Sequence, residues 1–150
     1  MRSAVLLAVA MTFAGAATAQ LRLPVIVPLR GSAQPPALVG IDALRADFLA
    51  RAGTDTVFFG GESAVLGAPA QASLQAQAMW LRQHPEVVVR IEGHAAPSDT
   101  RDHALAIGAR RAEEVRNYLV LLGVPAVQLN TMSWGKERPG LPRVVTVLVR

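Results

Sequence analysis

The chain has 150 residues, of which 51% are hydrophobic, and a formal net charge of +4. This size suits one compact domain with an additional apolar segment. Acidic and basic residues are interspersed, and no run of Lys or Arg alternates with aromatic residues, which argues against a nucleic-acid partner. The sequence contains no cysteine, so it offers neither a disulfide framework nor the thiol to which bacterial lipoproteins attach their lipid.

Residues 1–19 have the pattern of a signal peptide. Arg2 gives a positive start, residues 4–14 form an apolar run too short to span a bilayer, and residues 17–19 (Ala-Thr-Ala) form a small-residue cleavage site. A retained membrane anchor is the alternative, but polar residues interrupt the run before the roughly 20 apolar residues that a span needs. We expect export, cleavage after Ala19 and a periplasmic mature protein, free or associated with the outer membrane, with no integral membrane segment. Its net charge would be 15 − 1 − 11 = +3.

Residues 20–38 follow, and their four prolines resist both helix and sheet. We interpret this segment as an extended linker. Ile41, Leu44 and Phe48 then recur at helical spacing before Gly53, which predicts a short amphipathic helix within residues 39–53 whose role is packing. The folded domain is expected at 54–150.

The remaining chain alternates strand-like and helix-like segments. Runs of β-branched and aromatic residues predict strands, and apolar residues three or four positions apart predict helices. The order β-α-β-α-β-β favours a two-layer α/β (α+β) sandwich, a mixed sheet with two helices on one face. The expected strands are 56–59, 87–92, 129–134 and 143–149, and the expected helices are 70–83 and 103–122.

The last predicted helix and the loop before it form the most promising region for a ligand. The apolar and small residues of this helix predict one buried face, and its charged residues, including Arg110 and Arg111, are expected to fall between them. A loop that leads into a helix is a common ligand site. The predicted buried face consists of Leu105, Gly108, Ala112, Val115, Leu119 and Leu122.

No arrangement of residues indicates catalysis. The chain has three histidines and scattered serines but no G-x-S-x-G motif. His94 and His103 could bind a metal with an aspartate from residues 99–102, but no H-x-x-x-H or H-E-x-x-H spacing supports this. We expect no enzymatic activity, no metal and no cofactor. His94, directly after a buried strand, is interpreted as a hydrogen-bonded structural histidine, and Glu62 and Glu92 as solvated or salt-bridged carboxylates.

Four motifs, in this order and at these offsets, resemble the OmpA-like C-terminal domain. They are I-E-G-H at 91–94, I-G-x-R-R-A-x-x-V at 107–115, Y-L at 118–119 and S-W-G-K-E-R-P at 133–139. The likeness extends over residues 57–139, and within the family the chain most resembles the peptidoglycan-associated lipoproteins, apart from the missing cysteine. The resemblance implies the fold predicted above. It also implies a non-catalytic cell-envelope protein that binds the diaminopimelate part of the peptidoglycan stem peptide.

The family's ligand-binding arginine, which suits a carboxylate because of its planar fork, maps onto Arg111. The family's aspartates map onto Ala96 and Gly60, its loop asparagine onto Ala104 and its loop glycine onto Asp99, so the chain departs from the family at these positions. The resemblance therefore implies a modified peptidoglycan site with these positions: Arg111, Phe59, Gly60, His94, Ala96 and Asp99.

The missing carboxylates leave two main hypotheses. Losing a charge-assisted hydrogen bond to a ligand ammonium weakens binding by about 1.5 to 3 kcal/mol, or roughly ten- to a hundredfold. In the first hypothesis, Asp99 or Asp102 supplies the carboxylate and the chain still binds the stem peptide. In the second, the domain is a degenerate OmpA-like scaffold that binds an envelope protein instead. An enzyme is a third possibility that no set of residues supports.

Overall fold

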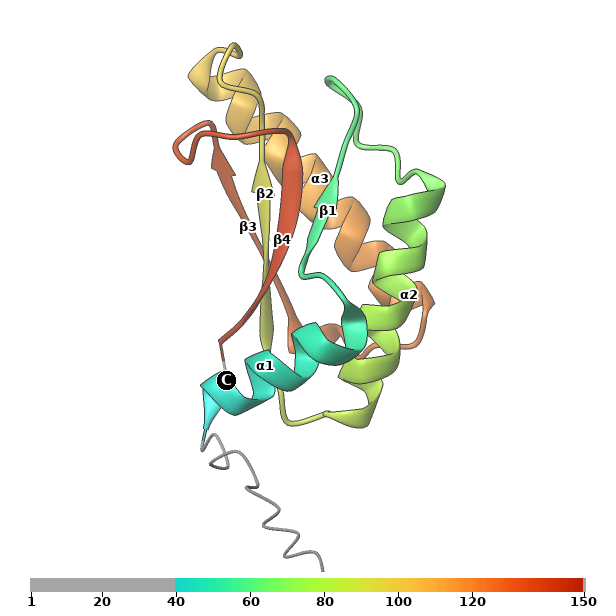
Figure 1. Cartoon of the computed structure of the whole chain (residues 1–150). Coiled ribbons are helices and arrows are strands. Elements are labelled where there is room, and N and C mark those ends of the chain that lie inside the picture. The colour runs from blue at the N-terminus through green and yellow to red at the C-terminus, as the bar shows by residue number, and fades with distance from the viewer. Residues whose placement is uncertain (1–39, 150) are drawn as a thin grey trace, which may run out of the picture. The chain divides into compact units, whose positions relative to one another are not determined.

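The computed structural model describes residues 40–149, so the expected signal peptide at 1–19 and the expected linker at 20–38 lie outside the described residues. Within this range the chain forms three α-helices, one short 3₁₀ helix and four strands (Figure 1). In chain order they are α1 (Ile41–Ala52), β1 (Thr56–Phe58), α2 (Ala68–Gln83), β2 (Val89–His94), α3 (Arg101–Leu121), η1 (Ala126–Gln128), β3 (Leu129–Gly135) and β4 (Arg143–Leu148).

The four strands form one mixed sheet in the order β1-β4-β2-β3. β2 and β3 run parallel, whereas β4 pairs antiparallel with both β1 and β2. Helices α2 and α3 cover one face of this sheet (Figure 1). The predicted two-layer fold is confirmed, and the predicted bounds differ from the observed ones by one or two residues. For example, β2 begins at Val89 rather than at residue 87.

The core lies between the sheet and its two covering helices. Leu74 and Leu81 of α2, Ile91 of β2 and Leu119 of α3 have no exposed surface. Full burial of such a side chain stabilises the fold by about 1.5 to 3 kcal/mol. These residues come from elements far apart in the sequence, so the core joins both helices to the middle of the sheet.

The expected short helix forms as α1 and packs against α2. Phe48 of α1 is fully buried and meets the Trp80 ring edge-on, with ring centroids 5.1 Å apart. The indole Nε1 of Trp80 donates a 2.7 Å hydrogen bond to Asp47 Oδ2. A large aromatic pair with a satisfied indole N–H is a strong packing contact, which gives α1 the packing role predicted for it.

Helix α3 lies unusually close to β2 because glycines meet at their contact. A Cβ atom on Gly93 would lie only 1.9 Å from the carbonyl oxygen of Gly108. A Cβ on Gly108 would lie 2.4 Å from Ser133 Oγ. Only glycine allows the two backbones to approach in this way, and the contact fixes the start of α3 over the ends of β2 and β3.

Strand β1 is at one edge of the sheet. Thr146 N–H donates to Asp55 O and Phe59 N–H donates to Pro142 O, so residues 55, 57 and 59 direct their backbone groups to β4 and residue 56 directs its own to the open edge. The Thr54 hydroxyl bonds to both backbone groups of Thr56: it accepts from Thr56 N–H at 3.0 Å and donates to Thr56 O at 3.1 Å.

The helices formed by residues 40–149 do not include one with both the length and the apolar character that crossing a bilayer requires.

Candidate functional site

Arg111 lies on the buried face of α3. The prediction that it falls between the buried positions is wrong, because residue 111 follows Gly108 by three and precedes Val115 by four and so shares their face. Its residue exposure is 1%, among the lowest of the charged residues that the structure describes. A buried guanidinium is unfavourable unless its N–H groups are hydrogen-bonded, and these partners are present.

Three backbone carbonyls accept hydrogen bonds from the Arg111 guanidinium. Nε donates to Ser63 O at 2.9 Å, Nη1 donates to His94 O at 3.0 Å, and Nη2 donates to Gly61 O. The Phe59 ring lies below it, 5.5 Å from Cζ to the ring centroid, which permits a cation–π contact. Arg111 therefore fastens the β1–α2 loop, residues 59–67, to the end of β2.

Two carboxylates and an imidazole lie beside this arginine. Glu62 comes from the β1–α2 loop, Asp99 from the loop between β2 and α3, and His103 from the first turn of α3. Their potential ligand atoms all lie within 4.8 Å of one another, and His103 Nε2 is 3.8 Å from Glu62 Oε2. Such a group can bind an ammonium or a metal cation.

The electrostatics of the site tie these carboxylates to Arg111. Burial lowers the pKa of the Arg111 guanidinium below its ordinary value, and the negative charges of Asp99 and Glu62 act in the opposite direction by favouring the protonated form. The site thus combines one buried cation with two more exposed anions.

The β2–α3 loop, residues 95–100, carries Asp99 and is held at several points. Asp99 N–H donates to Ala96 O at 3.3 Å, and the Thr100 hydroxyl caps α3 by accepting from His103 N–H at 3.4 Å. Lys136 Nζ donates to Asp99 O at 2.7 Å. The side chain of Asp99 is therefore presented from a loop whose backbone is constrained.

The remaining predicted residues occupy different positions around this loop. Gly60 is exposed, Ala96 is half-buried in the β2–α3 loop, and Phe59 is buried below Arg111. Ala104, which stands where the family has its loop asparagine, is fully buried in a small apolar cluster with Ala95 and Ile107. The structure thus gathers Arg111, Asp99 and Phe59, whereas Gly60 and Ala96 contribute no side-chain polar group.

His94 takes part through its backbone oxygen and not through its ring. The residue is 1% exposed, as expected of a structural histidine, but Nδ1 has no hydrogen-bond partner among the described residues, so the expected hydrogen bond is absent at this atom. Burial, followed by the positive charge of Arg143, lowers the pKa of the His94 ring to about 4. The ring is therefore neutral at pH 7.

The predicted set did not include Glu62, Gly61, Ser63 or His103. Their signal in the sequence is weak: Glu62 is the first charged residue after a strand and a glycine pair, and His103 follows Asp99 by four positions. Neither spacing indicates that the two loops meet. The meeting depends on Arg111, which bonds to the β1–α2 loop and to His94, the residue directly before the β2–α3 loop.

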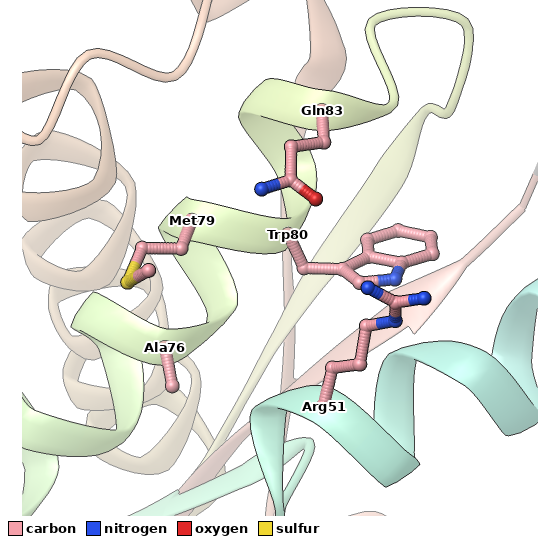
Figure 2. Close-up of a pocket in the computed structure, with 5 residues that line it drawn as sticks. All are labelled: Arg51, Ala76, Met79, Trp80 and Gln83. Carbon is pink, nitrogen blue, oxygen red and sulfur yellow. The ribbon is translucent and has the colours of Figure 1, made fainter.

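A separate hollow of about 300 Å³ lies between α1 and α2. Figure 2 shows Arg51 of α1 reaching toward Trp80, with Ala76, Met79 and Gln83 on the same side of α2. None of the predicted site residues lines it. The hollow lies where the two helices pack, and its lining includes Arg51 and Gln83 but neither of the carboxylates that lie beside Arg111.

Comparison with known proteins identifies the family. Residues 58–143, which run from the last residue of β1 through α2, β2, α3 and β3 to the first residue of β4, match the OmpA family. The chain belongs to the OmpA family. The match contains both loops around Arg111 but excludes α1, so the candidate site lies within the OmpA region.

The relatives of this OmpA domain include proteins named peptidoglycan-associated lipoprotein. The chain is 47% identical over 93 residues to that of Rhizobium meliloti and 45% identical to that of Agrobacterium fabrum, covering 62% of this chain and 52% of each relative. The chain thus spans about half the length of the curated relatives it matches. The predicted resemblance to the OmpA domain of these lipoproteins is confirmed.

Solved structures support the OmpA fold. The peptidoglycan-associated lipoprotein from Burkholderia pseudomallei is 33% identical, with a TM-score of 0.62, and the match covers 65% of this chain and 92% of that one. The C-terminal domain of Helicobacter pylori MotB is 19% identical with a TM-score of 0.59, covering 64% of this chain and 84% of that one. At that identity the second likeness shows the fold alone.

Proposed function

We propose that the chain is a non-catalytic OmpA-family protein of the bacterial periplasm, associated with the outer membrane, that binds the diaminopimelate part of peptidoglycan stem peptides. The observation that carries the proposal is the convergence of Glu62 and Asp99 beside Arg111, with their ligand atoms within 4.8 Å of each other and of His103. The similarity to proteins named peptidoglycan-associated lipoprotein supports the choice of ligand.

The charges of the site suit a zwitterionic ligand. The ammonium of diaminopimelate would lie against the carboxylates of Asp99 and Glu62, which take over from the family carboxylates missing at Ala96 and Gly60. Arginine has five N–H donors, and three of those on Arg111 are bound to backbone carbonyls. The other two would be available to a ligand carboxylate at the junction of the two loops.

The Glu62–Asp99–His103 group could also hold a metal ion, but the charges favour the ammonium in our proposal. The two carboxylates beside a buried guanidinium leave a net charge of about −1, which matches a singly charged ammonium better than a divalent cation. The role of these groups is then recognition, and no residue in the site is assigned to a chemical step.

Binding of an envelope protein in place of peptidoglycan is the second candidate. It is favoured by the absence of polar side-chain groups at Gly60 and Ala96 and by the full burial of Ala104. In this case the two loops would form a protein-binding surface with no requirement for Asp99. The two functions therefore differ in their dependence on one carboxylate.

Binding of purified sacculi, together with titration of a diaminopimelate-containing stem peptide, tests the proposal. Asp99→Ala should weaken peptide binding roughly ten- to a hundredfold, because it removes a charge-assisted hydrogen bond. Asp102→Ala is the matched control, since it removes an exposed carboxylate three residues away that is not part of the group. Ala96→Asp should add little when Asp99 already supplies the carboxylate.

The alternative makes a different prediction for the same variants. If wild type, Asp99→Ala and Ala96→Asp all fail to bind the peptide at millimolar concentration, peptidoglycan binding is refuted and the protein-partner function replaces it. If only Ala96→Asp binds, the pocket has the family geometry but lacks a relocated carboxylate.

A further inference from the structure

The loop between β3 and β4, residues 136–142, lies against the loop that carries Asp99. Lys136 Nζ donates to the backbone oxygen of Asp99 at 2.7 Å, and Glu137 Oε1 pairs with Arg101 Nε at 3.0 Å. Directly before this loop, Gly135 O accepts from Ala95 N–H at 2.8 Å. Three consecutive residues thus contact the first residue of the Asp99 loop, Asp99 itself and the first residue of α3 directly after the loop.

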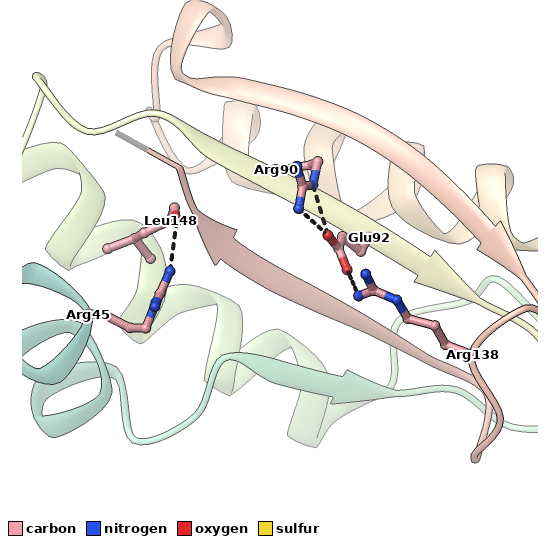
Figure 3. Close-up of polar contacts among 5 residues, drawn as sticks. All are labelled: Arg45, Arg90, Glu92, Arg138 and Leu148. Atoms are coloured by element: carbon pink, nitrogen blue, oxygen red, sulfur yellow. Dashed lines mark hydrogen bonds and ion pairs between the residues drawn. The ribbon is translucent and has the colours of Figure 1, made fainter. Parts of the chain in front are cut away.

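A buried carboxylate anchors the β3–β4 loop to the sheet. Glu92 of β2 is 1% exposed, and its two oxygens are paired with different arginines. Arg90 Nη2 lies 2.7 Å from Oε1, and Arg138 Nη1 lies 2.8 Å from Oε2. Figure 3 shows Arg90 and Arg138 approaching Glu92 from opposite directions along the strand. The Arg138 guanidinium also stacks 3.9 Å above the Trp134 ring.

This anchor joins one buried carboxylate to two partly exposed arginines, whose side chains are 38% (Arg90) and 51% (Arg138) exposed. Removing Arg138 leaves one buried oxygen of Glu92 without its charged hydrogen-bond partner, which destabilises the local structure more than the loss of a fully exposed ion pair would. Arg138 is the only one of the two arginines that belongs to the β3–β4 loop, and it lies two residues after Lys136. Glu92 therefore fixes the part of the loop from which Lys136 reaches Asp99.

We propose that Lys136 is a positioning residue for the ligand site, and that the Glu92–Arg138 pair holds it in place, so that the Asp99 carboxylate faces Arg111. The inference rests on the proposed function, because it assigns the position of Asp99 a role in ligand recognition. Lys136 acts on the ligand through Asp99, and its hydrogen bond is to the Asp99 backbone and not to the carboxylate. The β3–β4 loop thus becomes part of the site although no predicted site residue lies on it.

Lys136 is well suited to an experimental test because it is the only lysine in the chain. Lys136→Met keeps most of the aliphatic stem and removes the donor. Arg82→Met is the matched control, since it also removes one positive charge, but from the exposed last turn of α2. Arg138→Met removes the anchor while leaving Lys136 itself unchanged.

The test combines peptide titration with amide hydrogen exchange on the same variants of the full chain. Lys136→Met should weaken binding of the diaminopimelate-containing stem peptide on the order of tenfold, the effect of a misplaced charge-assisted contact. In an Asp99→Ala background the same substitution should have no further effect, because residues that act through one group are not additive. Exchange of the Asp99 N–H, which is bonded to Ala96 O, should become faster in Lys136→Met and Arg138→Met but not in Arg82→Met.

Each outcome decides between the two proposals. Unchanged binding in Lys136→Met, or an equal loss with and without Asp99, would overturn the positioning role while wild-type binding still supports the proposed function. If wild type does not bind the peptide at all, the proposed function and the ligand-site role of Lys136 fail together. Unchanged exchange of the Asp99 N–H would show in addition that Lys136 does not constrain the loop.

Discussion

Replacing Arg111 by methionine tests whether the guanidinium stabilises the fold through its hydrogen bonds to backbone carbonyls, or serves only to bind a ligand. Methionine has a similar stem, so the main loss is of the three hydrogen bonds to carbonyl oxygens. Hydrogen bonds from a charged donor contribute about 1.5 to 3 kcal/mol each. The His94 oxygen is enclosed, whereas the oxygens of exposed Gly61 and Ser63 can return to water. Relief of the buried charge offsets part of the loss.

We therefore expect Arg111→Met to lower the free energy of unfolding by about 2 to 4 kcal/mol, measured by urea denaturation as a lower midpoint with an unchanged slope. The neighbouring Arg110→Met is the control, because Arg110 is exposed on the same helix and should change stability by less than about 0.5 kcal/mol. If the two variants are equally stable, the guanidinium does not tie the loops together, and its burial has no energetic role.

Two further predictions concern β2. Gly93→Ala should destabilise the domain by about 3 kcal/mol or more in urea denaturation, because the new Cβ would overlap the Gly108 carbonyl. Gly60→Ala, with nothing within 4 Å of the added atom, should be neutral, and equal effects would contradict the close approach of α3. Because the pKa of His94 is lowered to about 4 from 6.5, the unfolded state binds more protons between these values. The free energy of unfolding should then fall by about 3 kcal/mol as pH drops from 6.5 to 4. His94→Gln should remove this pH dependence, and an unchanged dependence in the variant would refute its assignment to His94.

Local patterns were sufficient to predict the order of the elements. The spacing of Gly108, Val115 and Leu119 indicated the buried face of α3, and the strand-like run before Gly93 indicated a buried strand. The same spacing includes Arg111, although the prediction placed this residue between the buried positions. Its burial depends on carbonyls of Gly61 and Ser63, which lie 50 and 48 residues earlier in the chain.

The candidate site was only partly predictable for a related reason. Asp99 could be proposed from its loop, and its position beside Arg111 agrees with that hypothesis. Glu62 could not be proposed, because its approach to Asp99 requires the β1–α2 loop and the β2–α3 loop to meet in space. The pairing of Glu92 with Arg138 spans 46 residues and follows from the path of the β3–β4 loop, which no periodicity specifies.

The hydroxyl of Thr54 has a consequence for how the protein behaves in a crowded compartment. An unpaired strand edge offers free N–H and C=O groups to any extended chain and so promotes association between molecules. At Thr56 both groups are already bonded to Thr54, and β1 is only three residues long. The sheet therefore offers few free backbone N–H and C=O groups at the β1 edge. This protects the domain against strand-to-strand aggregation without a covering element.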